Sequence, residues 1–213
     1  MGGKSTLLRQ TALAAILAQI GCFVPAESCE LTPVDRVFTR IGASDRILEG
    51  KSTFYVEMEE TKNLLKCATP RSLAILDELG RGTSTFDGYS IANAVMQYLV
   101  RQLNCMTLFS THYHMLLDEF REFPGVKTYH MAYNANEAGD HVIFLYKFIQ
   151  GECPASFGIN VARMAGLPQR VLDIASQKSI LFAAQLDKVT DRAAQIRQQR
   201  RSAESGESAA EDQ

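Results

Sequence analysis

The chain contains no tryptophan, no long apolar run and no excess of positive charge. None of its apolar stretches approaches the roughly 18 residues that a membrane-spanning helix needs, so we expect a soluble intracellular protein without a membrane partner. Its 22 lysines and arginines are offset by 24 acidic residues, for a net charge of −2. Polybasic proteins that bind nucleic acid by bulk charge are therefore excluded, and any DNA contact must be local or indirect.

The sequence also lacks paired cysteines. Its five cysteines are scattered and include no CxxC pair, a spacing that signals neither a zinc site nor a disulfide framework. We expect reduced thiols. The length of 213 residues suits one domain with an appendage.

Apolar runs alternate with helical patterns up to about residue 182, and this order predicts an α/β fold with a mixed or parallel sheet. The apolar run Leu73 to Leu76 is typical of a parallel strand buried on both faces. Two β-rich segments around a polar turn predict a peripheral hairpin over Lys127 to Phe148. Further helices are predicted at 5–19, 52–67 and 89–103, and further strands at 20–24, 36–41 and 106–109.

The end of the body predicts a helix at Ser156 to Ala165, a turn, and a second helix at Gln169 to Phe182. Because this helix-turn-helix lacks a basic recognition face, we interpret it as an interaction unit rather than a DNA reader. The residues after it segregate basic from acidic side chains, which indicates solvated chain. We therefore divide the sequence into a domain at 1–151, a two-helix unit at 152–182 and a disordered or partly helical tail at 183–213.

A glycine-rich segment, Gly2-Gly3-Lys4-Ser5-Thr6, stands at the head of the first predicted helix. It fits the second half of the phosphate-binding pattern G-x-x-x-x-G-K-[ST]. In that pattern backbone N–H groups surround the phosphates, the lysine reaches the β and γ oxygens, and the hydroxyl ligates magnesium. The first glycine of the pattern would precede Met1. Alone, the segment fits a flexible glycine-rich end equally well.

Two adjacent acids, Asp77 and Glu78, follow the apolar run at 73–76. The carboxyl edge of a parallel sheet is where α/β proteins bind ligands, so Asp77 can hold magnesium directly or through water. Glu78 is placed to polarise an attacking water as general base. The alternative is that an acid at a strand end caps the next element.

A histidine, His112, lies just beyond the predicted strand at 106–109. It is placed to hydrogen-bond a γ-phosphate or the attacking water. The alternative is a histidine that satisfies a local backbone group, and His114 is interpreted as a bystander. Two further segments, the glycine-rich loop Gly80 to Gly88 and the helix start at Ser52, fit either functional loops or ordinary connections and caps.

Five segments, taken in order, resemble the ATPase domain of the MutS family of DNA mismatch-repair proteins, an ATP-binding-cassette type of ATPase. They are GGKST (2–6), TRIGASD (39–45), GKSTFYVEM (50–58), LAILDELGRGTSTFDG (73–88) and FSTHYH (109–114). The resemblance runs from Met1 to about Ile180. Three stretches are most similar to the sixth MutS homologue of eukaryotes: Phe23 to Ala26, Leu31 to Arg36 and Tyr146 to Gly151.

The resemblance implies an ABC-type P-loop ATPase domain at 1–151, acting with ATP and Mg²⁺ in DNA repair in the nucleus. The segment Gly2 to Thr6 would bind the nucleotide, with Lys4 on the β and γ phosphates. Ser5 and Asp77 would hold magnesium. Glu78 would activate water and His112 would sense the γ-phosphate.

The resemblance also implies a partner, another MutS homologue whose ATPase domain completes the site. Ser52 would reach the nucleotide of that partner in trans, the loop Gly80 to Gly88 would lie at the shared interface, and the two-helix unit would help to hold the subunits together. Mismatched DNA would be bound by regions that this chain lacks.

The family pattern begins with a strand and Gly-Pro-Asn ahead of the residue that is Met1 here. We therefore expect a fragment or a gene model started at an internal methionine, with weakened nucleotide binding. Two functions stay open: the ATPase and dimerisation domain of a mismatch-repair protein, or a catalytically incompetent module that acts only by pairing with another MutS homologue. Other ATP-binding-cassette families are less favoured because their signature sequences are absent.

Overall fold

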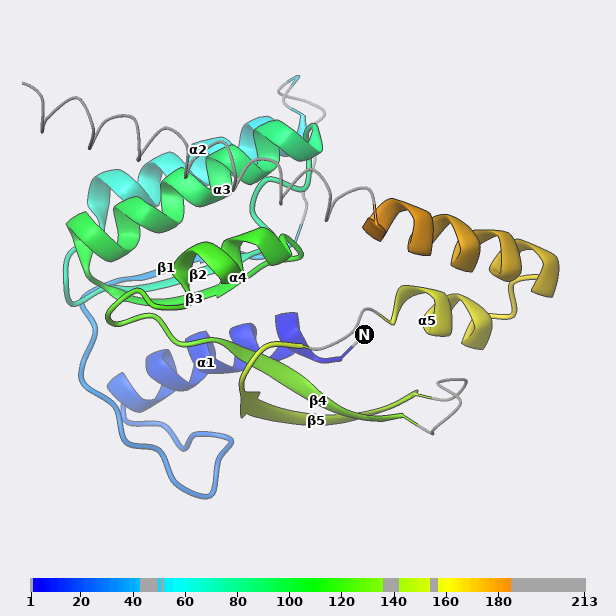
Figure 1. Cartoon of the computed structure of the whole chain (residues 1–213). Helices are drawn as coiled ribbons and strands as arrows, with labels where there is room; N and C mark the ends of the chain where they lie inside the picture. The colour runs from blue at the N-terminus through cyan, green and yellow to red at the C-terminus, as the bar shows by residue number, and fades with distance from the viewer. Residues whose placement is uncertain (1, 43–49, 51, 136–141, 154–156, 185–213) are drawn as a thin grey trace, which may run out of the picture. The chain divides into compact units, whose positions relative to one another are not determined.

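The computed structural model describes residues 2–42, 50, 52–135, 142–153 and 157–184 (Figure 1). The chain forms two compact units, one of residues 1–134 with 144–153, the other of residues 135–143 with 154–213. The order of helices and strands is that of an α/β fold, as predicted. Within the described residues no helix is long and apolar enough to cross a membrane.

The first unit is built on a parallel sheet of three strands in the order β1-β2-β3. The strands are β1 (Val37–Arg40), β2 (Leu73–Asp77) and β3 (Met106–Ser110). Four residues of the central strand β2, 73–76, are buried, which confirms the prediction of a parallel strand covered on both faces. The register pairs Asp77, the last residue of β2, with Ser110, the last residue of β3.

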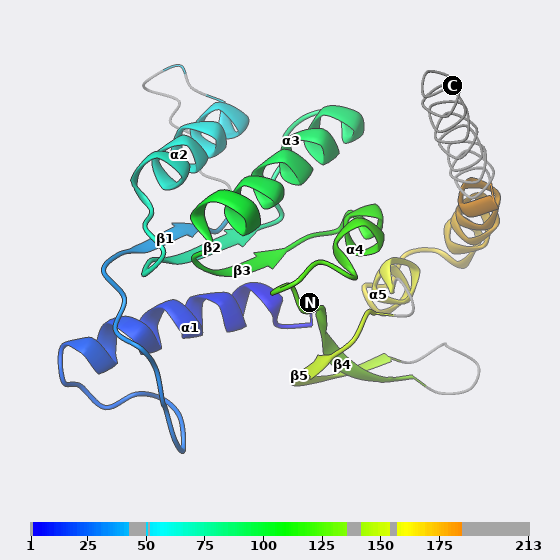
Figure 2. The same cartoon turned by 60° about the vertical axis from the view of Figure 1, so that its left-hand side comes forward.

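Helices cover both faces of this sheet, with α1 on one side and α2 and α3 on the other (Figure 2). They are α1 (Lys4–Gln19), α2 (Thr53–Cys67) and α3 (Thr85–Tyr98). Side chains of a strand point alternately to its two faces. Ile75 accordingly packs in the apolar cluster with α1, while Ala74 and Leu76 pack in the cluster with α2 and α3.

Serine caps set the starts of α2 and α3. The Ser52 hydroxyl oxygen accepts the Tyr55 N–H at 3.2 Å, and α2 begins one residue later, as predicted. The Ser84 hydroxyl oxygen accepts the Asp87 N–H at 3.2 Å. The predicted start of the third helix at Tyr89 is therefore wrong, because this cap starts α3 at Thr85 inside the glycine-rich segment. A single π-helical turn, Leu99–Leu103, continues α3.

The predicted strand at 20–24 is wrong. Gly21 adopts a left-handed φ of 78° after the end of α1, and the Phe23 side chain is fully exposed. The run belongs to neither sheet. It is apolar, but among the described strands none pairs with it, and its backbone forms a surface loop.

The predicted hairpin is present as β4 (Tyr129–Ala135) and β5 (Val142–Gln150), which form a separate two-stranded sheet. The rings of Tyr129 and Phe148 stack across it, with centroids 4.5 Å apart. Most of the turn predicted at Asn134 to Asp140, namely residues 136–140, lies outside the described residues. A short helix, α4 (His114–Phe120), was not predicted; Leu116 and Phe120 on it are buried.

The second unit contains α5 (Gly158–Met164) and a helical stretch at 169–184. Gly166, with φ of 82°, allows the chain to turn between them, and the Leu167 N–H donates to the Ala162 carbonyl at 3.1 Å. Residues 154–156, which include the predicted first residue of the first helix, and residues 185–213, nearly all of the predicted tail, lie outside the described residues.

Candidate nucleotide-binding site

Three elements of the first unit meet at the carboxyl edge of its parallel sheet: the head of α1, the end of β2 and the end of β3. The Asp77 carboxylate is the centre of this meeting. Its Oδ2 atom accepts the Ser5 hydroxyl at 2.5 Å and its Oδ1 atom accepts the Ser110 hydroxyl at 2.5 Å. The structure thus brings together the GKS segment and the acidic pair, 72 positions apart.

The backbone at the head of α1 requires a glycine at position 3. Gly3 adopts a left-handed φ of 90° and makes no side-chain cap. A Cβ atom on Gly3 would lie 3.0 Å from the Tyr146 ring, so a larger residue would be strained and crowded. The N–H groups of the first helical turn, which starts at Lys4, have no intrahelical partner and carry the positive end of the helix dipole. Thr6, in the same turn, is exposed.

Glu78 connects three parts of the site. Its Oε1 atom lies 3.7 Å from the Lys4 Nζ, and its Oε2 atom accepts the Arg81 Nη1 at 2.5 Å. Its backbone N–H donates to the Ser110 carbonyl at 3.0 Å. Glu78 also has a φ of 53°, which is uncommon for a residue with a side chain and is found where the surroundings enforce it.

His112 follows β3, and its imidazole ring lies 4.0 Å from the Tyr113 ring, centroid to centroid. Partial burial lowers its pKa below the ordinary value of 6.5. The charges of Arg81 and Lys4 lower this pKa as well, whereas the charge of Glu78 raises it. The neutral ring, with one nitrogen as donor and the other as acceptor, is therefore favoured at pH 7.

The residues at this edge fit a magnesium ion. Mg²⁺ prefers oxygen ligands and is commonly held by one or two carboxylates together with substrate phosphates and water. The Ser5 hydroxyl and the Asp77 carboxylate, 2.5 Å apart, are two such oxygens. In the described part of the chain no group of three or more His, Cys, Asp or Glu side chains is placed to hold a metal, so an ion here would need phosphate and water oxygens as well.

Sequence reasoning assigned no role to two residues of this site, Arg81 and Ser110. Both lie close to residues that the motifs single out: Arg81 stands three positions after Glu78, and Ser110 ends the strand next to Asp77. The signal for Ser110 was available, since neighbouring parallel strands that end together place their last side chains side by side.

Ser52 makes only a local contact in the described structure, the cap to the Tyr55 N–H. Its side chain is exposed. The expected contact is with a nucleotide on a partner subunit, so the role of Ser52 stays a prediction. The roles of Gly2, Gly3, Lys4 and Thr6 in binding a nucleotide also stay predictions.

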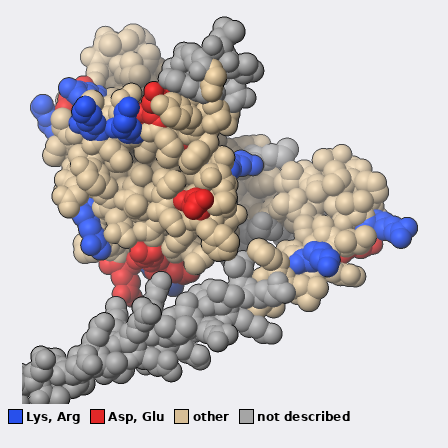
Figure 3. Space-filling view, turned by 90° about the horizontal axis from the view of Figure 1, so that it is seen from above, with Lys and Arg blue, Asp and Glu red and all other residues tan. Residues whose placement is uncertain are grey.

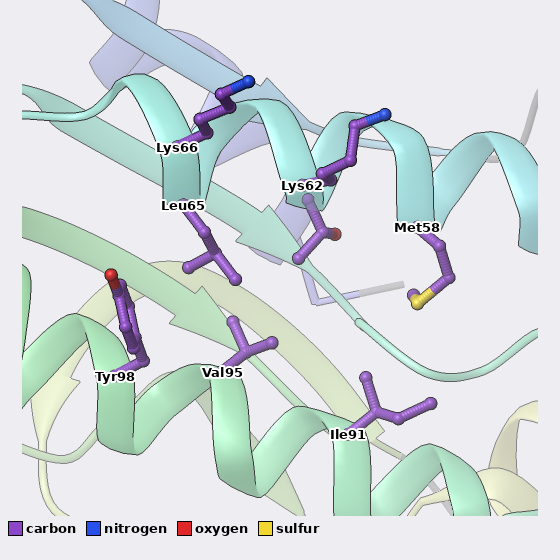
Figure 4. A pocket seen from close by; sticks show the side chains of 8 residues that line it. Met58, Lys62, Leu65, Lys66, Ile91, Val95 and Tyr98 are labelled. Carbon is purple, nitrogen blue, oxygen red and sulfur yellow. The ribbon is translucent and has the colours of Figure 1, made fainter.

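A separate groove of about 470 Å³ lies between α2 and α3 (Figure 4). Its lining combines apolar side chains with the stems of two lysines: Met58, Thr61, Lys62, Leu65, Lys66, Ile91, Val95 and Tyr98. None of the predicted site residues lines it. From above, acidic and basic side chains form small groups of both signs on the face in view, with no continuous basic surface among the described residues there (Figure 3).

Comparison with known proteins gives the family. The sequence model described as MutS domain V matches residues 1–183. The DNA mismatch repair protein Msh6 of Homo sapiens is 54% identical over 187 residues, which cover 85% of this chain and 14% of that protein. The DNA mismatch repair protein MSH7 of Arabidopsis thaliana is 54% identical over 184 residues, covering 83% of this chain and 17% of that protein.

A bacterial relative is equally similar. The DNA mismatch repair protein MutS of Ruminiclostridium cellulolyticum is 55% identical over 179 residues, covering 83% of this chain and 20% of that protein. The chain thus spans between 14% and 20% of the length of these relatives. It belongs to the MutS family of DNA mismatch repair proteins, and its similarity is to the region of them called domain V.

Proposed function

We propose that this chain is the ATP-binding and ATP-hydrolysing domain of a mismatch-repair protein, in which ATP is coupled to mismatch recognition and to clamping on DNA. The observation that carries the proposal is the Ser5–Asp77 hydrogen bond of 2.5 Å. It joins half of a phosphate-binding loop to the acid of a buried parallel strand, which is the arrangement of P-loop ATPases.

The head of α1 would bind the phosphates. Lys4 would exchange its contact with Glu78 for the β and γ oxygens, while the free N–H groups of the first helical turn donate to the same phosphates. Ser5 and Asp77 would hold magnesium, which when bound neutralises charge on the phosphates. Ser110 would keep the Asp77 carboxylate oriented through its hydrogen bond of 2.5 Å.

Glu78 would take a proton from the attacking water. In the structure its carboxylate contacts Lys4 and Arg81, and nucleotide binding would free its Oε1 atom by drawing Lys4 to the phosphates. The neutral His112 ring would donate a hydrogen bond to the γ-phosphate or to the water.

The proposal includes a second MutS homologue as partner, with mismatched DNA bound by regions outside this chain. In this pair the segment Gly80 to Gly88, where Phe86 is 86% exposed, would lie at the contact with the partner. The relatives named above come from eukaryotes and from a bacterium, so a nuclear location stays a prediction.

A non-catalytic interaction module is the second candidate. The observation that favours it is the exposed apolar surface of the helical stretch at 169–184, where Ile174, Ile180 and Phe182 are 53%, 71% and 63% exposed. Such a surface fits pairing with another subunit. It requires no turnover of ATP.

Calorimetry with ATP and Mg²⁺, followed by a phosphate-release assay on the same chain, decides between the two. We expect binding and slow release of phosphate.

Lys4→Ala should abolish binding, and Glu78→Gln should keep binding while slowing turnover by about 10²-fold or more, because it removes the general base. Lys62→Ala, at an exposed lysine of α2, is the control and should change neither. Absence of binding, or binding without turnover, would contradict the ATPase and favour the interaction module.

A further inference from the structure

The backbone of Gly80 is held on both sides by buried side chains. Its N–H donates to the Glu57 Oε1 at 3.1 Å, and its carbonyl accepts the Tyr113 hydroxyl at 3.0 Å. Glu57 on α2 is 2% exposed and Tyr113 after β3 is 7% exposed. Buried hydrogen bonds of this kind are costly to lose because the remaining partner has no water to replace them.

The same point joins the two ends of the segment Gly80 to Gly88. A Cβ atom on Gly80 would lie 2.4 Å from the Gly88 carbonyl oxygen, and one on Gly88 would lie 2.3 Å from the Tyr113 hydroxyl. Only glycine fits at either position. The two glycines, the tyrosine hydroxyl and the glutamate therefore form one close-packed contact, which we call the Gly80 clamp.

Arg40 supports the glutamate of the clamp. Its Nη2 atom lies 3.5 Å from the Glu57 Oε1, and the residue is 8% exposed. Its Nε atom has no hydrogen-bond partner among the described residues and lies 3.6 Å from the Glu60 Oε2. A buried charge left without its partner is strongly unfavourable. The clamp is thus tied to β1 as well as to α2.

The clamp lies next to the proposed general base. Gly80 is two residues after Glu78 and directly before Arg81, whose N–H donates to the Glu78 carbonyl at 3.3 Å. Glu78 has the left-handed φ of 53°, which persists only where neighbouring contacts enforce it. Among the described residues, neither Glu57 nor Tyr113 hydrogen-bonds to the Glu78 carboxylate, so any effect on it must pass through the backbone of residues 78–81.

From this geometry we propose that Glu57 and Tyr113 are positioning residues, which hold the backbone of residues 78–81 so that the Glu78 carboxylate and the Arg81 guanidinium face the head of α1. The inference rests on the proposed function for its effect on catalysis. Its structural part, the hold on the loop, is independent of any nucleotide.

The test combines hydrogen–deuterium exchange without nucleotide and steady-state kinetics with ATP. Tyr113→Phe removes only the hydroxyl of the clamp. We expect exchange across residues 79–88 to become several-fold faster, and kcat to fall about 10-fold or more while the Kd for ATP stays within about twofold, since a small misplacement of a catalytic group is costly. Tyr89→Phe is the matched control, because the Tyr89 hydroxyl donates to Glu119; it should change neither readout.

Glu57→Gln is the second variant, in case Tyr113→Phe does not fold. Glutamine keeps an acceptor for the Gly80 N–H but loses the charge opposite Arg40, so we expect a smaller increase in exchange than for Glu57→Ala. Unchanged exchange at 79–88 in the folded variants would overturn the inference, as would faster exchange with an unchanged kcat. If the unaltered chain neither binds nor hydrolyses ATP, the proposed function fails, and the exchange data alone then decide whether the clamp holds the loop.

Discussion

Single side chains of this protein show how the candidate site is assembled from distant segments. Asp77 receives two hydroxyl hydrogen bonds, from Ser5 and Ser110, while Glu78 is engaged by Lys4 and Arg81. The two neighbouring acids therefore have different surroundings. One is bound by neutral hydroxyl donors of the kind that accompany a metal, and the other is bound by cations that a nucleotide would compete for.

The pKa of His112 gives a prediction at this scale. Partial burial lowers this pKa below 6.5, and the Glu78 charge opposes the shift. NMR titration of the ring should therefore give a pKa below 6.5 in the unaltered chain and a lower one in Glu78→Gln. Because the folded pKa is depressed, the neutral ring contributes stability above pH 6.5, and this contribution is lost as the pH falls through the folded value.

Glu119→Gln is the control for the titration, since Glu119 is not among the charges that act on His112. A rise in the His112 pKa on neutralising Glu78 would show that the carboxylate and the imidazole are not electrostatically coupled as the structure indicates.

At the scale of helices and strands, the sequence predicted those elements that are set by nearby residues, such as an apolar run or a capping serine. The apolar run at 73–76 predicted β2, and Ser52 predicted the start of α2. The run at 20–24 is as apolar as a buried strand, but it pairs with none of the described strands. Only the tertiary structure shows that this partner is lacking. The seven-residue helix α4 is too short for a periodic pattern to be recognised.

The candidate site follows the same division. Lys4, Ser5 and Asp77 could be singled out from motifs because glycine and lysine have a defined chemistry with phosphate, and hydroxyl and carboxylate oxygens with magnesium. The Gly80 clamp could not, since the pairing of Glu57 with a backbone N–H 23 positions away depends on how α2 packs. A buried glutamate carries no signal in the sequence that distinguishes it from an exposed one.

The start of α3 gives a prediction at the scale of the element. The Ser84 hydroxyl accepts the Asp87 N–H and donates to the Asp87 carboxylate at 2.9 Å. Ser84→Ala should lower the free energy of unfolding by about 0.5–2 kcal/mol, the usual effect of losing an N-cap. Urea unfolding measures the change.

Ser90→Ala provides the comparison, because the Ser90 hydroxyl only donates to the Phe86 carbonyl within the same helix. The cap would have no special importance for α3 if both variants lost the same amount of stability.

At the scale of the whole molecule, the chain matches one part of much longer relatives. It spans 14% of human Msh6 and 20% of a bacterial MutS. The predicted site residues Lys4, Asp77 and His112 nevertheless all lie within it. A net charge of −2 agrees with the proposal that DNA is bound by other regions and that this region would couple the protein to ATP. The central claim of this proposal is that the phosphates of ATP bind at the carboxyl edge of the parallel sheet.

The most direct test of that claim is the affinity for ATP, measured by calorimetry with Mg²⁺ and with a chelator, for the unaltered chain and for Asp77→Asn. We predict that Mg²⁺ strengthens ATP binding by about 10-fold or more in the unaltered chain, because Ser5 and Asp77 would supply its protein ligands. In Asp77→Asn the difference between the two conditions should disappear. Equal dependence on Mg²⁺ in both proteins, or no binding of ATP by either, would contradict the account.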